Sequence, residues 1–101
     1  MICGNGFAHQ WCAELEAAAH VPTAGVRVVI LHPKYRGSCS QPVYRNGTVR
    51  LPACLFDGTM DWGRTWRHEL QHAVDDRAGL LWTMTTDEAE ARAGAAERSL
   101  P

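Results

Sequence analysis

Two histidines and a glutamate stand close together in the segment His68-Glu69-Leu70-Gln71-His72. An α-helix advances about 100° per residue, so His68 and His72 lie about 40° apart on a helix, one turn along its axis. Both imidazoles can therefore reach one metal ion, and neutral imidazole is a good zinc ligand. Glu69 directly follows the first histidine, where its carboxylate can take a proton from a zinc-activated water molecule. The segment predicts one Zn²⁺ ion bound by His68 and His72, with Glu69 as the catalytic base.

The helix that must carry these residues is predicted from Trp62 to about Arg77, with Gly79 at its C-terminal cap. Its apolar side chains recur at intervals of three and four residues and are centred roughly opposite the histidines. They are Trp62, Trp66, Leu70, Ala73 and Val74. The helix can therefore bury one face and hold a metal ion on the other.

A catalytic zinc ion usually has three protein ligands and an open position for water, so two histidines leave one ligand to be found. Asp75, Glu88 and Glu90 are the candidates. Asp75 lies on the same helix, which makes a tetrahedral arrangement harder, and Glu90 points about 200° away from Glu88 around a helix. Glu88 has an alternative role, because Thr85-x-x-Glu88 matches a capping box.

Residues 68–80 resemble the active-site helix of the zincin metallopeptidases, and among them the thermolysin-like gluzincins. The likeness covers His68 to Asp76, which read His-Glu-Leu-Gln-His-Ala-Val-Asp-Asp, and then Gly79-Leu80. In that family the third ligand is a glutamate on a following helix, in the pattern Glu-x-x-Ser/Ala-Asp. The segment from Glu88 to Ala91 matches it, so the resemblance implies that Glu88 is the third zinc ligand. Arg92 replaces the family's Asp, and Asp76 is the candidate for the missing contact to a ligand histidine.

The resemblance covers roughly residues 26–98, and the closest families in size are the single-domain minigluzincins. It implies an α+β fold in one domain, residues 1–101: a minimal zincin-like domain with a small sheet, an edge hairpin, the active-site helix and a C-terminal glutamate helix. Larger gluzincins have a second subdomain that supplies oxyanion donors, for which 101 residues leave no room. The implied substrate is a peptide or protein that pairs with the edge strand before the active-site helix.

The remaining elements follow from local patterns. Helical periodicity marks residues 7–19, and a β-branched run marks a strand at residues 26–31. Residues 43–45 and 48–51 flank Asn46-Gly47, a type I′ hairpin signal. Residues 48–51 are expected at the sheet edge, either as a strand that binds substrate or as an ordinary edge strand. The sheet is expected to have two or three strands. A third helix is predicted from residues 85–87 to about 99, and Trp82 before it is a candidate to line the cleft.

Composition restricts the other classes of function. The net charge is −1 and no basic tract occurs, which argues against a nucleic-acid partner. No run of about 18 apolar residues and no signal peptide occur, so we expect no membrane span and a cytoplasmic location, with secretion after removal of a leader as the alternative. Cys3, Cys12, Cys39 and Cys54 contain no Cys-x-x-Cys pair, which leaves disulfides and buried thiols both open.

These features predict hydrolysis of peptide bonds by zinc-activated water. One alternative is a zinc-stabilised scaffold without turnover, because no His or Tyr follows His72 to stabilise a transition state. A second alternative is a regulatory or interaction module that keeps the fold and has lost the metal. The sequence specifies neither the substrate nor the oligomeric state.

Overall fold

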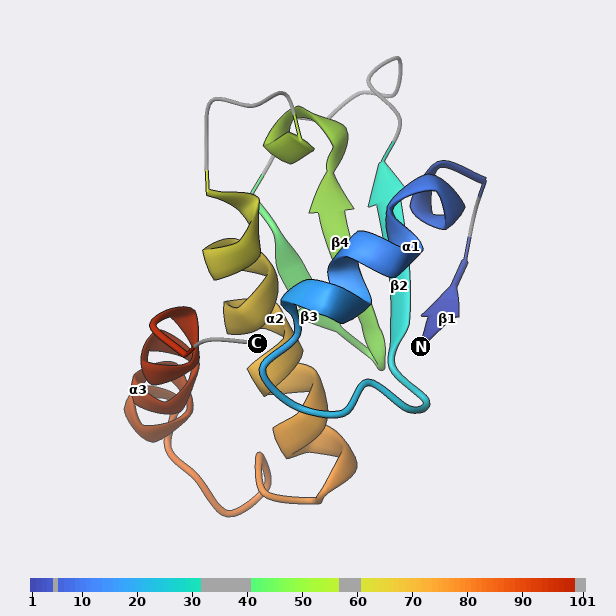
Figure 1. Ribbon diagram of the computed structural model, residues 1–101. Helices are drawn as coiled ribbons and strands as arrows, with labels where there is room; N and C mark the ends of the chain where they lie inside the picture. Colours follow the sequence, from blue (N-terminus) through green and yellow to red (C-terminus); the bar gives the residue numbers. More distant parts are fainter. Residues whose placement is uncertain (5, 32–40, 57–60, 100–101) are drawn as a thin grey trace.

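The sheet has the strand order β1-β2-β4-β3 in the computed structural model, which describes residues 1–4, 6–31, 41–56 and 61–99 (Figure 1). Its strands in these ranges are β1 (Ile2–Cys3), β2 (Arg27–Leu31), β3 (Val43–Arg45) and β4 (Thr48–Pro52). β2 pairs in parallel with β1 and with β4, whereas β3 is antiparallel to β4. The described residues therefore form a small α+β structure, as expected, and its sheet is mixed and has four strands where two or three were predicted.

The hairpin β3–β4 has the turn that Asn46-Gly47 predicted, since both residues have positive φ angles, of 50° and 82°. Its place in the sheet differs from the prediction. β4 is an inner strand between β2 and β3, and the edge is formed by β3. Because β4 alternates inward-facing Val49 and Leu51, both fully buried, it belongs in the centre of the sheet.

Helix α1 (Gly6–Ala18) crosses one face of the sheet, and α2 (Trp62–Arg77) packs against α1, β3 and β4 (Figure 1). A short 3-10 helix, η1 (Ala53–Phe56), follows β4. Leu15 of α1 and Trp66 of α2 are fully buried between them, and the Trp66 indole N–H donates to the Leu15 carbonyl at 2.8 Å. The predicted apolar face of α2 is confirmed, because Trp66, Leu70 and Ala73 are in the core.

Both ends of α2 are fixed by local hydrogen bonds. At the start, the Asp61 side chain accepts from the Arg64 N–H. At the end, Gly79 has φ +77° and donates to the Asp76 carbonyl, while the Leu80 N–H donates to the Asp75 carbonyl. This pair of bonds is a Schellman motif, which explains why glycine is required there.

Helix α3 (Thr86–Glu97) packs on α2, on the side away from the sheet (Figure 1). Its buried residues are the small side chains Ala89, Ala93 and Ala96, which are not part of the core cluster of the sheet, α1 and α2. The two helices thus lie close together, with little apolar area between them.

The cysteines form disulfides where the structure describes them. Cys3 and Cys12 join β1 to α1, and Cys54 is also disulfide-bonded. Cys39 lies outside the described residues. Disulfides are typical of oxidising compartments.

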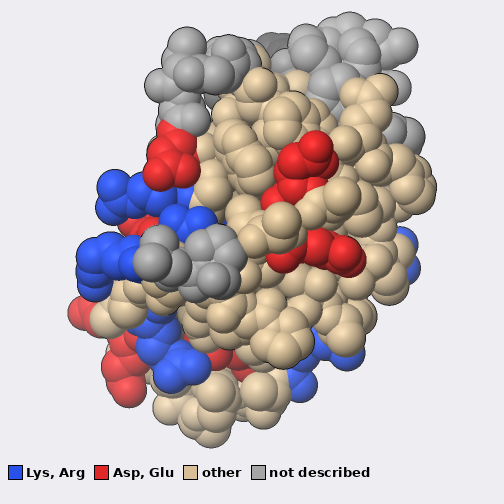
Figure 2. Space-filling view, in the orientation of Figure 1, with Lys and Arg blue, Asp and Glu red and all other residues tan. Residues whose placement is uncertain are grey.

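Two further observations concern the surface. Of the helices in the described part of the chain, none is long and apolar enough to cross a membrane. On the face shown in Figure 2, acidic and basic side chains are mixed on the α3 side, and the described residues show no extended basic area there.

Candidate metal centre

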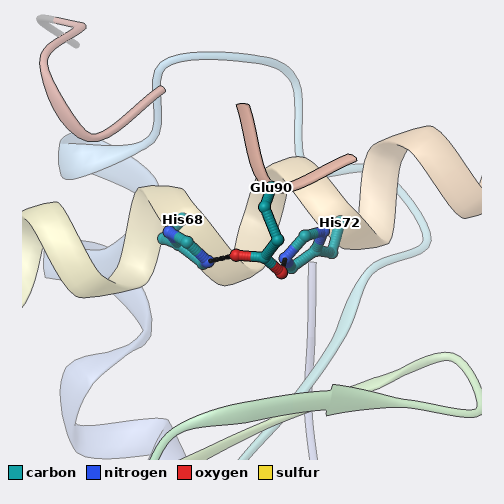
Figure 3. A group of neighbouring side chains, drawn as sticks. All are labelled: His68, His72 and Glu90. Carbon is teal, nitrogen blue, oxygen red and sulfur yellow. Dashed lines mark ion pairs between the residues drawn. The ribbon is translucent and has the colours of Figure 1, made fainter. Parts of the chain in front are cut away.

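The imidazoles of His68 and His72 project from the same side of α2 toward the carboxylate of Glu90 on α3 (Figure 3). Glu90 Oε2 lies 3.2 Å from His68 Nε2, and Glu90 Oε1 lies 3.1 Å from His72 Nε2. All three donor atoms are within 4.8 Å of one another. We call these three residues the metal centre.

The donor set fits zinc. Two imidazole nitrogens and one carboxylate oxygen are a known ligand combination for catalytic zinc, with metal–ligand distances of about 2.0–2.2 Å. Ligands at these distances in a tetrahedral arrangement are about 3.4 Å apart. The two Nε2–oxygen distances, 3.2 and 3.1 Å, are close to that separation, although they involve different oxygens of Glu90.

Glu88, the expected third ligand, is not brought to the histidines. Its carboxylate accepts a hydrogen bond from the Thr85 N–H at 3.2 Å, and the Thr85 hydroxyl accepts from the Glu88 N–H at 3.1 Å. Glu88 therefore forms the capping box that was its alternative role. Because Glu90 is two residues further along α3, about 200° around its axis, only one of the two can face α2.

Asp75, another candidate for the third ligand, also has other hydrogen-bond partners. Arg92 donates from Nε to Oδ2 and from Nη2 to Oδ1 of Asp75, both at 2.8 Å, and Gln71 donates to Oδ1 at 2.8 Å. Burial alone disfavours the Asp75 anion, but the hydrogen bonds from Arg92 and Gln71 outweigh it and lower the Asp75 pKa. Arg92, which departs from the gluzincin pattern, thus joins α3 to α2.

Glu69 is buried beside the metal centre, with 9% of its surface exposed. Burial raises the pKa of Glu69 to about 7, against the opposing charge of His68 and a hydrogen bond from the Tyr44 backbone N–H. A carboxylate whose pKa is near neutral is suited to accept and return a proton at physiological pH. A cation bound by the neighbouring side chains would lower this pKa again.

The surroundings of His72 affect its protonation. Burial lowers the pKa of His72, although the nearby Glu90 carboxylate opposes this effect. The neutral imidazole is the form that coordinates zinc.

The orientation of His68 is fixed from α3. Its Nδ1 atom is 2.7 Å from Oε1 of Glu97, whose second oxygen lies 3.8 Å from Nη2 of Arg64. An Nδ1–H that donates to a carboxylate leaves the Nε2 lone pair directed at the metal centre. The contact expected from Asp76 is therefore made by Glu97.

Asp76 instead accepts a hydrogen bond from the hydroxyl of Tyr44 on the edge strand β3. Burial, followed by the hydrogen bond and the charge of Asp76, raises the pKa of Tyr44 to about 12. The phenol is therefore neutral and remains a hydrogen-bond donor at physiological pH.

Two openings adjoin the metal centre. The first, of about 350 Å³, is bordered by residues 41–44 and contains the metal centre and Glu69, and we call it the metal cleft. The second, of about 330 Å³, lies between the end of α2 and the start of α3 and shares Tyr44 and His72 with the first. Trp82, a candidate for the cleft, is 87% exposed and lines neither opening.

Helical periodicity could have placed Glu90 and Glu97 on the face of α3 that meets α2. They are seven residues apart, which is two helical turns, and each directly follows a buried alanine of the α3 stripe. No comparable signal marks Tyr44, because its position depends on how the hairpin packs against α2.

Comparison of the chain with models of protein families, with curated proteins and with solved structures finds no match. Inference about function therefore depends on the geometry of the metal centre.

Proposed function

We propose that the chain is a zinc-dependent metallopeptidase of zincin type, in which the metal centre binds the ion and Glu69 is the general base. The observation that carries this proposal is the convergence of His68, His72 and Glu90 within 4.8 Å beside a buried carboxylate, in an open cleft. Glu90 takes the place that the family resemblance suggested for Glu88.

A bound zinc ion would lower the pKa of water and polarise the carbonyl group of the substrate. Glu69 accepts the proton that the attacking water loses and returns it to the nitrogen of the leaving amine as the C–N bond breaks. Glu97 keeps Nε2 of His68 directed at the metal centre. Tyr44 lines the same cleft, but its single hydroxyl proton is donated to Asp76, so we assign it no role in stabilising the oxyanion.

The edge strand β3 supports a peptide substrate. Its residues Val43 and Tyr44 border the metal cleft, and the Tyr44 N–H donates to Glu69. The outer edge of β3 is thus turned toward the metal centre. An extended peptide that adds to this edge by main-chain hydrogen bonds would have to use groups other than the Tyr44 N–H, which Glu69 already accepts.

A zinc-stabilised scaffold without turnover is the second candidate. Only small alanine side chains and polar contacts hold α3 to α2 among the residues described. An ion between Glu90 and the two histidines would join the two helices, which favours a structural role for the metal. The Cys3–Cys12 disulfide supports an oxidising, extracytoplasmic location for either function.

The substitution Glu69→Gln separates the two candidates. It keeps the shape of the side chain but removes the basic carboxylate. We expect about one zinc ion per chain and a melting temperature near that of the wild type, with cleavage of unfolded casein lower by a factor of about 100 or more. Zinc is measured by atomic absorption and cleavage by release of labelled fragments.

Glu88→Gln is the matched control, because it makes the same chemical change two residues from Glu90 and outside the metal centre, and it should retain cleavage. If the zinc-loaded wild-type protein and the Glu69→Gln variant do not differ in the substrates they cleave, the peptidase proposal is wrong and the scaffold stands. If no zinc binds, both fail.

A further inference from the structure

We propose that Asp76 is a positioning residue for the general base, and that it acts through Tyr44 of the edge strand. This inference rests on the proposed function and adds a residue that supports catalysis without contacting the metal ion or the substrate. The path has two contacts: Asp76 holds the Tyr44 hydroxyl, and the Tyr44 backbone N–H donates to Glu69.

The pairing of the hairpin directs the Tyr44 backbone N–H away from β4. Asn46-Gly47 is a two-residue turn, so the first pair of strand residues beside it is hydrogen-bonded and the second, Tyr44 with Val49, is not. Residues of a pair without mutual hydrogen bonds turn their N–H and C=O groups to the outer side of the strand. The Tyr44 N–H therefore lies on the open edge of β3, which is where Glu69 accepts it.

The Tyr44 side chain contacts α2 at a second point. Its hydroxyl donates to Oδ2 of Asp76, which follows Glu69 by seven residues, or about two helical turns. Glu69 and Asp76 thus share one side of α2, about 10 Å apart along its axis. Because Tyr44 is held at both points, β3 has a fixed position along the helix, which one contact alone would not give it.

The consequence for Glu69 concerns its orientation. A carboxylate has two oxygens, and an oxygen that accepts from the Tyr44 N–H leaves the other for the attacking water. Glu69 borders the same cleft as the metal centre, so a small rotation of its carboxylate changes the distance to that water. Misplacement of a catalytic group by about 1 Å can cost about 100-fold in rate. Asp76 therefore affects the rate of reaction through the orientation of Glu69.

Two substitutions remove the contact from opposite sides. Asp76→Ala removes the acceptor, and Tyr44→Phe removes the donor while it keeps the ring and the backbone N–H. In zinc-saturated protein, with labelled casein as substrate, we expect each change to lower kcat about tenfold and to leave KM within about twofold of wild type. The double variant should be no slower than either single variant, because both changes remove the same hydrogen bond.

Asp76→Asn distinguishes the hydrogen bond from the charge. Its side-chain oxygen still accepts from the Tyr44 hydroxyl, so it should keep kcat within about threefold of wild type. Asp87→Ala is the matched control, since it makes the same change as Asp76→Ala at an exposed residue in the first turn of α3, and it should keep kcat. Zinc affinity should stay within about threefold of wild type in every variant, because none of them removes a ligand.

Exchange of the Tyr44 amide, followed by NMR, tests the path without turnover. Glu69→Ala removes the acceptor of this amide and Asp76→Ala releases the tyrosine, so we expect both to accelerate its exchange about tenfold. The Val49 amide of the inner strand β4 is the internal reference and should keep its rate.

The outcomes separate the positioning role from the proposed function. If wild-type protein cleaves casein and Asp76→Ala has the same kcat, the positioning role is wrong and the peptidase stands. If wild-type protein cleaves nothing, the peptidase proposal fails and the role of Asp76 in catalysis fails with it. Tyr44→Phe gives the same test if Asp76→Ala does not fold.

Three further results would overturn the positioning role while cleavage persists. The first is a loss of kcat that Asp76→Asn does not restore, which would assign the effect to charge. The second is a parallel loss of zinc affinity, which would assign it to the metal centre. The third is a Tyr44 amide that exchanges at one rate in wild type, Asp76→Ala and Glu69→Ala.

Discussion

Glu88 and Glu90 are two residues apart on α3, and their carboxylates have different partners: Thr85 for the first and the two histidines for the second. We expect Glu90→Ala to weaken zinc binding by more than about 100-fold, because it removes a ligand rather than a supporting contact. Glu88→Ala should leave zinc affinity unchanged and cost about 0.3–1.5 kcal/mol of unfolding free energy through loss of the capping box. Competition with a fluorescent chelator measures the affinity, and denaturant unfolding measures the stability.

The opposite pattern would contradict this assignment. Zinc lost in Glu88→Ala and kept in Glu90→Ala would mean that α3 rotates by about half a turn when the metal binds and that the original expectation from the gluzincin pattern was correct.

Glu97 acts on the metal through His68, so its removal should have a smaller effect than removal of Glu90. We predict that Glu97→Gln weakens zinc binding by about 10- to 100-fold, because the amide is a poorer acceptor for the Nδ1–H of His68. The same titration measures it. Arg64→Gln is the control, since it removes the longer 3.8 Å contact to Glu97 and leaves the contact to His68. Equal affinities of Glu97→Gln and wild type would show that His68 is oriented without Glu97.

The part of the candidate site that the sequence predicted is the part that lies on one helix. His68, Glu69 and His72 have their relation fixed by α2 alone, because helical spacing places residues one turn apart on the same side. Glu90 and Glu97 reach them only through the packing of α3 on α2. The capping box occupies Glu88, so local structure and the family pattern made competing demands on one residue.

At the scale of elements, α2 and α3 are joined by a buried carboxylate. Asp75 is 1% exposed, and Arg92 binds both of its oxygens. The lowered pKa of Asp75 means that, near the ordinary aspartate value of about 3.9, the unfolded chain binds more protons than the folded one. The contribution of Asp75 to stability is therefore complete above that value and is lost as the pH falls through the lower pKa of the folded state.

We therefore predict that Asp75→Asn lowers the melting temperature by a constant amount above about pH 5, and that the difference from wild type shrinks as the pH falls below about 4. Asparagine has a similar shape but cannot ionise, so it removes this pH dependence, and its amide group cannot accept all the hydrogen bonds that Arg92 and Gln71 donate to Asp75. Melting curves by circular dichroism between pH 2 and 7 measure the difference. A gap that stays constant down to pH 2 would show that the charge of Asp75 does not support the helix pair.

The elements that sequence patterns predicted best are those with local signals. α2 has its predicted bounds, and the Asn46-Gly47 turn has the predicted positive φ angles. β1 was missed because two residues are too short for a periodic pattern. The edge position expected for residues 48–51 was wrong, because the parallel pairing of β2 with β4 joins segments that are distant along the chain and leaves no mark in the local sequence.

At the scale of the whole molecule, the core and the metal centre occupy different layers. The core lies between the sheet, α1, η1 and α2, and the buried residues of α3 are outside it. Glu90 and Glu97, which bind the histidines, both belong to α3. An ion at the metal centre would therefore stabilise the attachment of α3 far more than it stabilises the sheet.

Removal of zinc should release α3 before it affects the core. In hydrogen exchange followed by mass spectrometry, we expect the amides of α3 to exchange about 100-fold faster after treatment with a chelator, if free zinc was about 100 times its Kd beforehand. Amides of β2 and β4 should keep their exchange rates, because no contact in their layer depends on the ion. Glu69→Gln should respond as wild type does, and Glu90→Ala should exchange rapidly in α3 with or without zinc. An equal change in α3 and in the sheet would mean that the metal supports the entire fold. No change in either would mean that the contacts between side chains of α2 and α3 hold α3 without the ion.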